Sequence, residues 1–139
     1  RNWQPDGESY VTYTEERNYN GTAGFQAYET KALREFLLKH KSSNGQTLLI
    51  DLHGWLDESI GDNDIGLIYR KNFNLSNHIP SYGRGYLINW ARKSLTGTKV
   101  ARSALIELPE VKSHTELVNK NYANKYIKAT MEMLNTFNK

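Results

Sequence analysis

The stretch Leu48-Leu49-Ile50-Asp51-Leu52-His53-Gly54-Trp55 decides which fold we expect for this 139-residue chain. A short apolar run between turn residues predicts a strand over 47–54, buried on both faces within a parallel or mixed sheet that helices cover. His53 stands at the end of this strand, where a side chain can leave a rigid sheet and face a pocket. This position suits a metal ligand, but a strand-end histidine with a structural partner fits the same pattern.

A second apolar run lies about fifty residues later and contains one carboxylate. The run Ala104-Leu105-Ile106-Glu107-Leu108-Pro109 closes a second strand, which we expect over 98–108. Burial among apolar neighbours raises the pKa of a carboxyl group, and a raised pKa suits a general base. The two runs together indicate metal-assisted hydrolysis. In the alternative interpretation, Glu107 is a paired structural acid.

Strands alternate with helices along the chain. Periodic apolar residues predict helices over 27–41, 65–75, 84–95 and 114–136. We expect one polar loop over 55–63 and another that follows the helix over 65–75 and runs to Gly85. Ser113 and Glu116 stand in capping-box register before the last helix. Its expected inner face consists of Leu117, Tyr122, Tyr126, Ile127 and Met131. Residues 1–25 are predicted to be mostly loop. This order predicts an α/β fold, a mixed sheet covered by helices, in a single domain over 1–139.

Composition excludes several classes of partner. The net charge is +3, and the basic residues are scattered, so we expect no nucleic-acid partner. Cysteine is absent, which excludes disulfides and thiolate metal sites. No apolar run approaches the length of about 18 residues that a membrane span needs. The opening segment Arg1-Asn2-Trp3-Gln4-Pro5 reads like the interior of a longer protein.

A catalytic zinc site needs three protein ligands and one open position. The chain has four histidines, and none begins a His-x-x-Glu pair, so a complete site is not visible. His40 lies at a helix end, where it caps the helix dipole. His78 fits chance surface placement in a loop, and His114 with Glu110 straddles a helix start. His53 is therefore the candidate ligand.

Four segments follow one another in a characteristic order: Arg1-Asn2-Trp3, Glu29-Thr30-Lys31-Ala32-Leu33, Ile50-Asp51-Leu52-His53-Gly54 and Leu105-Ile106-Glu107-Leu108. They resemble successive motifs of the zinc metallocarboxypeptidases related to pancreatic carboxypeptidase A, and the resemblance covers essentially the whole chain. It implies the C-terminal half of a carboxypeptidase-like catalytic domain. Arg1-Asn2-Trp3 matches the last three residues of the family's Asn-Arg-Asn/Asp-Trp motif. The family's His-x-x-Glu ligand pair and a further substrate arginine lie upstream of that motif, whereas this chain begins on its arginine, Arg1.

The resemblance implies a role for four residues. His53 would be the third ligand of one zinc ion, and Glu107 the general base. Arg1 would anchor the terminal carboxylate of the substrate, for which a guanidinium is well suited. Tyr82 would be the mobile tyrosine that covers the bound substrate, with Tyr86 as the alternative. Two further arginines, Arg84 and Arg102, either contact an acidic substrate or lie on the surface.

Three hypotheses follow. The first is a zinc carboxypeptidase that cleaves a peptide or isopeptide bond near a free carboxylate, with bacterial peptidoglycan peptides as one substrate class and a secreted or cell-envelope location. The second is a catalytically dead homologue that binds peptides or cell-wall fragments. The third is an unrelated α/β binding domain in which His53 and Glu107 are structural, and a distance above about 10 Å between His53 Nδ1 and the Glu107 carboxylate would favour it. Under the first hypothesis the isolated chain binds zinc weakly, lacks activity and dimerises through exposed surface.

Overall fold

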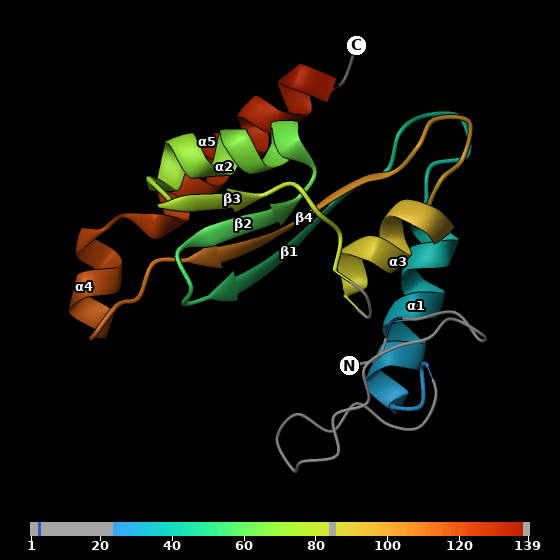
Figure 1. Cartoon of the computed structure of the whole chain (residues 1–139), viewed down its shortest axis with the longest axis horizontal. Helices are drawn as coiled ribbons and strands as arrows, with labels where there is room; N and C mark the ends of the chain where they lie inside the picture. The colour runs from blue at the N-terminus through green and yellow to red at the C-terminus, as the bar shows by residue number, and fades with distance from the viewer. Residues whose placement is uncertain (1–2, 4–23, 84–85, 138–139) are drawn as a thin grey trace. The chain divides into compact units, whose positions relative to one another are not determined.

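The computed structural model describes Trp3 and residues 24–83 and 86–137. The chain divides into two compact units, Arg1–Leu49 with Tyr82–Arg102 and Ile50–Ser81 with Ser103–Lys139 (Figure 1). Helices alternate with the strands of a mixed sheet along the chain, so the predicted α/β class is confirmed. The carboxypeptidase-like fold and the single domain over 1–139 stay predictions. Of the loop predicted over 1–25, only Trp3, Gly24 and Phe25 belong to the described residues.

The first unit is held together by an aromatic cluster. Helix α1 (Tyr28–His40) and helix α3 (Leu87–Ser94) lie within the helices predicted over 27–41 and 84–95. The ring of Trp3 lies 5.2 Å from that of Trp90 and 5.6 Å from that of Phe25, measured between centroids. The buried residues of this core are Trp3, Trp90, Ala91, Leu95 and Ala101. Aromatic pairs at these separations add to the free energy gained by apolar burial.

The sheet contains four strands in the order β1-β4-β2-β3. Strand β2 (Glu58–Gly61) is antiparallel to β4 (Arg102–Leu108) and parallel to β3 (Asn77–Ile79). Strand β1 (Leu48–Gly54) lies beside β4, and the arrows of the two point the same way in Figure 1. The carboxyl ends of β1 and β4 therefore meet at the same end of the sheet.

Both strands predicted from apolar runs are present, but three details were wrong. Strand β1 is not buried on both faces, because it lies at the edge of the described sheet and its last three residues are exposed. Strands β2 and β3 lie in segments predicted as loops. They are short and polar, so their own sequence favours loop. Backbone pairing with a central buried strand overrides that preference.

Helices α2 (Asn63–Phe73) and α5 (Tyr122–Phe137) pack against each other on one side of the sheet (Figure 1). The Asp62 carboxylate accepts hydrogen bonds from the backbone N–H groups of Asp64 and Ile65, so α2 begins two residues before the predicted 65–75. Tyr69 is fully buried between the helices, and its hydroxyl lies 2.9 Å from Oγ1 of Thr130. Burial raises the pKa of Tyr69 to about 12.

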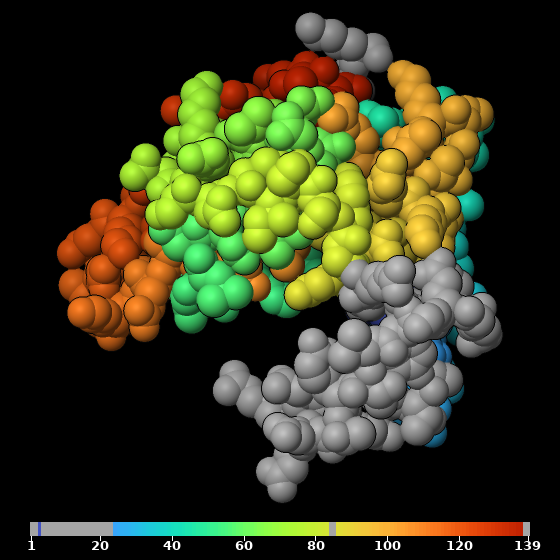
Figure 2. All heavy atoms as spheres, viewed as in Figure 1, coloured from blue at the N-terminus to red at the C-terminus, as the bar shows by residue number. Residues whose placement is uncertain are grey.

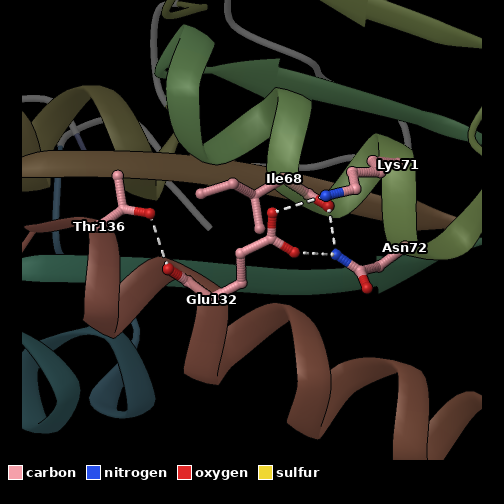
Figure 3. Close-up of polar contacts among 5 residues, drawn as sticks. All are labelled: Ile68, Lys71, Asn72, Glu132 and Thr136. Carbon is pink, nitrogen blue, oxygen red and sulfur yellow. Dashed lines mark hydrogen bonds and ion pairs between the residues drawn. The ribbon is translucent and has the colours of Figure 1, made fainter.

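A polar cluster also joins α2 to α5, and Figure 3 shows it. Glu132 of α5 accepts hydrogen bonds from Lys71 and Asn72 of α2, each at 3.0 Å. The side-chain amide of Asn72 also donates to the carbonyl of Ile68, and the hydroxyl of Thr136 donates to the carbonyl of Glu132. The hydrogen bonds that the carboxylate accepts from Asn72 and Lys71 lower the pKa of Glu132, and the Asn72 bond is the largest cause. Both oxygens of this carboxylate are therefore satisfied.

The helix predicted over 114–136 is two helices. Helix α4 (His114–Asn119) ends before Asn121, which adopts a positive φ of 54°, and α5 begins at the next residue. Ser113 caps α4 as predicted, by accepting from the N–H of Glu116. The buried residues of the last helix are Tyr122, as predicted, with Ala129 and Met133, whereas Ile127 and Met131 are exposed, against prediction. No residue of α4 is buried, and Figure 2 shows it at the outer end of the second unit.

Within the described part of the chain, no helix is long and apolar enough to cross a membrane.

Candidate catalytic site at the ends of β1 and β4

The site is built on two adjacent strands of the sheet. Side chains two residues apart on a strand point to the same face, so β1 presents Asp51 and His53 together. The neighbouring strand β4 supplies Glu107, one residue before its last position. The His53 side chain is about half exposed, whereas the Glu107 side chain is 10% exposed. An accessible imidazole thus lies above a buried carboxylate.

His53 stands between two carboxylates. Its Nε2 atom lies 2.9 Å from Oδ1 of Asp51, and its Nδ1 atom lies 3.8 Å from Oε1 of Glu107. A separation above about 10 Å between His53 Nδ1 and the Glu107 carboxylate would have favoured the unrelated-domain hypothesis, and the structure does not show it. The structure therefore brings together the two residues that the sequence singled out. Their roles as zinc ligand and general base stay predictions.

Glu107 is a buried acid whose charge is poorly compensated. Burial is the largest cause that raises its pKa, and the charges of Glu58 and Asp51 raise it further. His53 and a hydrogen bond from the backbone N–H of Leu56 act in the opposite direction. The second carboxylate oxygen, Oε2, is buried and has no hydrogen-bond partner among the described residues. The carboxyl therefore holds a proton more readily than an ordinary glutamate does.

Two acidic residues of this region were not predicted as site residues. Asp51 lies inside the quoted stretch, and its spacing of two from His53 was the available signal. Glu58 lies directly opposite Glu107 in the β2–β4 register. Like charges facing each other across strands are unfavourable. Because β2 was predicted as loop, nothing in the sequence indicated this pairing.

The donor set for zinc is partial. Among the described residues, no group of three or more histidines or acids is arranged to hold a metal ion. His53 supplies one imidazole, and Glu107 stands beside it with an unpartnered oxygen. These two residues suit one ligand position and one proton acceptor of a zinc hydrolase. They do not suit a complete site by themselves.

The other predicted substrate residues lie outside the described part of the second unit. Arg1 and Arg84 lie outside the described residues, and Tyr82 belongs to the first unit. The guanidinium of Arg92 lies over the ring of Tyr82, 4.9 Å from its centroid. Tyr86, the alternative to Tyr82, directly precedes α3 and is 47% exposed. Its ring lies so close to Gly83 that a Cβ there would come within 2.3 Å of it.

The remaining histidines are structural or exposed. His40 Nδ1 lies 2.8 Å from the carbonyl of Phe36 at the end of α1, in agreement with its predicted capping role. His114 is exposed at the start of α4. His78 was expected on the surface by chance, and that prediction was wrong. It lies on β3 with Nδ1 2.8 Å from the hydroxyl of buried Ser59, because β3 pairs with β2.

Comparison with known proteins gives one relative to report. No protein-family profile matches the chain, and no solved structure matches it. The bacteriocin BCN5 of Clostridium perfringens is 37% identical over 123 residues, which cover 85% of this chain. The chain spans only 13% of the length of that bacteriocin. The match therefore relates this chain to one segment of a much longer bacterial protein.

Proposed function

We propose that this chain is part of a zinc peptidase that hydrolyses a peptide or isopeptide bond next to a free carboxylate. One observation carries the proposal: the His53 imidazole lies 3.8 Å from the buried Glu107 carboxylate, at the ends of two adjacent strands. Two of the four segments that carry the resemblance to the zinc metallocarboxypeptidases contain these same two residues. Sequence motif and geometry thus support the same chemistry.

In this proposal His53 would hold one coordination position of the metal. Zinc, when bound, polarises a substrate carbonyl and makes water easier to deprotonate. The family's other two ligands form the His-x-x-Glu pair, which lies upstream of the motif that begins at Arg1. Because no group of three metal ligands is present among the described residues, we expect the 139-residue chain by itself to bind zinc weakly and to lack peptidase activity.

Glu107 would act as the general base. Its pKa is raised by burial, which brings it closer to neutral pH and makes proton transfer in both directions easier. The Leu56 N–H fixes the orientation of the carboxyl, and Oε1, which lies on the side of His53, would accept a proton from water. The carboxyl would then pass this proton to the nitrogen of the leaving amine. Arg1 would bind the free carboxylate of the substrate, and Tyr82 would cover it.

The substrate class that we favour is the peptide of bacterial peptidoglycan. A relative that is a bacteriocin is consistent with a secreted or cell-envelope protein. Cell-wall peptides contain isopeptide bonds close to free carboxylates, which is the bond type proposed here. A catalytically dead homologue that binds the same fragments is the alternative.

The test uses the longest natural polypeptide that contains this chain, incubated with purified peptidoglycan peptides, and mass spectrometry of the products. We expect Glu107→Gln to lower the hydrolysis rate by about 100-fold or more, since general bases contribute factors of this size. We expect His53→Ala to lower the bound zinc, measured by elemental analysis.

Glu132→Gln is the matched control, because it removes the same charge from a carboxylate on the outer helices. It should change neither rate nor zinc content. Unchanged hydrolysis in Glu107→Gln would overturn the proposal. Fragment binding without any hydrolysis by the wild type would favour the dead homologue.

The isolated chain provides a second test. Zinc that stays bound in a one-to-one ratio after dialysis against a weak chelator would contradict the expected weak binding. We also expect the chain to dimerise, because β1 is an edge strand of the described sheet and Leu52 on it is 43% exposed. Light scattering that gives a strict monomer would contradict this expectation.

A further inference from the structure

Asp51 has a specific relation to the His53 ring. Its Oδ1 atom lies 2.9 Å from Nε2 of His53, which is a hydrogen-bond distance for a charged acceptor. The Asp51 side chain is 19% exposed, and it lies within an otherwise apolar strand. Among the described residues, His53 is the one hydrogen-bond or ion-pair partner of this carboxylate. A half-buried charge on an apolar strand is costly unless it has such a partner.

The contact decides which ring nitrogen carries hydrogen. A neutral imidazole has one N–H donor and one nitrogen with a free electron pair. A carboxylate at 2.9 Å from Nε2 accepts the hydrogen there. The distance of 3.8 Å from Nδ1 to Glu107 is too long for a hydrogen bond, so Glu107 does not compete for it. The electron pair is thus left on Nδ1, on the side of Glu107.

We propose that Asp51 is a positioning residue, which holds His53 as the Nε2–H tautomer and aims the Nδ1 electron pair toward the Glu107 side of the site. A carboxylate that accepts from the far nitrogen of a metal-ligating histidine fixes the ring and strengthens the ligand. The assignment of Nδ1 as the metal-binding atom rests on the proposed zinc function. The tautomer does not, because it follows from the Asp51 contact alone.

The first measurement is the tautomer of His53 in the purified chain. Long-range nitrogen–proton NMR correlations at alkaline pH distinguish the two tautomers, and a His53→Gln variant assigns the signals. We expect the wild type to show the Nε2–H form alone. Asp51→Ala should give averaged nitrogen shifts from a mixture of both forms. Asp51→Asn, which keeps the shape and an acceptor oxygen, should lie between them.

Glu107→Gln is the control for this measurement and should leave the tautomer unchanged. An Nδ1–H tautomer in the wild type would overturn the inference, because the hydrogen would then face Glu107. A tautomer that changes in Glu107→Gln but not in the Asp51 variants would overturn it as well. Asp51→Asn keeps the test valid if the alanine variant fails to fold.

The second measurement is zinc titration of the same samples, followed at the His53 signals. We expect zinc to perturb Nδ1 first and Asp51→Ala to weaken binding by about 10-fold or more. Zinc that perturbs Nε2 first would contradict the inference. If zinc leaves the His53 signals unchanged in every sample, the proposed zinc function is overturned. If the Nε2–H tautomer is confirmed in the same samples, the role of Asp51 in fixing the ring is supported independently.

Discussion

Two glutamates of the second unit have opposite environments. Glu132, on the outside of the α2–α5 pair, accepts hydrogen bonds from Lys71 and Asn72, and these bonds lower its pKa. Glu107, at the end of β4, is buried with one oxygen unpartnered, and burial raises its pKa. The fold thus stabilises the charged form of Glu132 and destabilises the charged form of Glu107. Glu107 is one of three described side chains with a buried polar atom that lacks a hydrogen-bond partner, the others being Asp57 and His78, and it is the one that lies 3.8 Å from His53.

The difference indicates where this chain carries chemistry. Structural polar groups are expected to be fully hydrogen-bonded, and the contacts around Glu132 follow that rule. A buried acid with a raised pKa next to a histidine is the pattern of a functional site. We therefore expect substitutions that disturb contacts between helices and sheet to lower the free energy of unfolding. Removal of the Glu107 charge at the end of β4 should raise it.

The largest stability effect is expected from Gly66→Ala in α2, the helix that supplies the hydrogen-bond donors of Glu132. A Cβ at this position would lie 2.5 Å from both Cε1 and Nδ1 of His78, so the ring must move away from Ser59. Alanine favours the helix by about 1 kcal/mol over glycine. Overpacking costs about 1–3 kcal/mol, and a lost buried hydrogen bond adds a similar amount. We expect a net loss of about 2 kcal/mol in urea unfolding.

A double-mutant cycle provides the control for Gly66→Ala. His78→Ala removes the ring that a Cβ would meet, so Gly66→Ala should destabilise the His78→Ala chain much less than the wild type. Equal effects in both backgrounds would show that the His78 contact is not the cause. Zinc binding, where measurable, should not follow these changes.

The next largest effect is expected from Glu107→Gln, with the opposite sign. Glutamine keeps the shape and can still accept from the Leu56 N–H, but it removes the buried charge. We expect a gain on the order of 1 kcal/mol at pH 8, since burying an uncompensated charge costs more than burying a neutral amide of the same shape. Thermal or urea unfolding of the two chains measures the difference.

The pH dependence of Glu107→Gln tests the cause. Because the pKa of Glu107 is raised in the folded chain, its carboxyl contributes stability below its ordinary pKa and loses this contribution as the pH rises through the raised value. The advantage of glutamine should therefore be largest at alkaline pH and disappear on acidification. An advantage independent of pH would contradict the explanation by burial of charge.

The smallest effect is expected from Glu132→Gln, which should lower stability slightly because the carboxylate is exposed to solvent. The pKa of Glu132 is lowered in the folded chain, so its contribution is present above its ordinary pKa and is lost as the pH falls through the lowered value. The Glu132→Gln and Glu107→Gln curves should therefore lie on opposite sides of the wild type at neutral pH. Curves on the same side would break the comparison between the two glutamates.

Sequence patterns located most of the secondary structure but not its polar pairings. The helices that became α1, α2 and α3 and the strands that became β1 and β4 could be predicted, because each has a periodic or continuous apolar pattern of its own. Strands β2 and β3 could not, because short polar segments become strands only through backbone pairing with neighbours. The break at Asn121 depends on a positive φ that the apolar spacing around it did not indicate.

The candidate site shows the same division. His53 and Glu107 could be selected from the sequence, since a histidine ending an apolar strand and an acid inside another are unusual residues in those places. Asp51 and Glu58 were not selected, although the spacing of Asp51 from His53 was an available signal. The contact of Asp51 with Nε2 depends on the orientation of the His53 ring, and the position of Glu58 depends on the register of β2.

The sequence by itself determined the α/β class and the two residues on which the proposed chemistry depends, because apolar periodicity and isolated polar residues are local properties. Only the tertiary structure decided that these residues lie 3.8 Å apart, that Glu58 faces Glu107 and that Asp51 accepts from His53. Strand order and register arise from contacts between segments far apart in the chain. Those contacts also determine which charges are buried, and burial is the main cause of the raised pKa of Glu107.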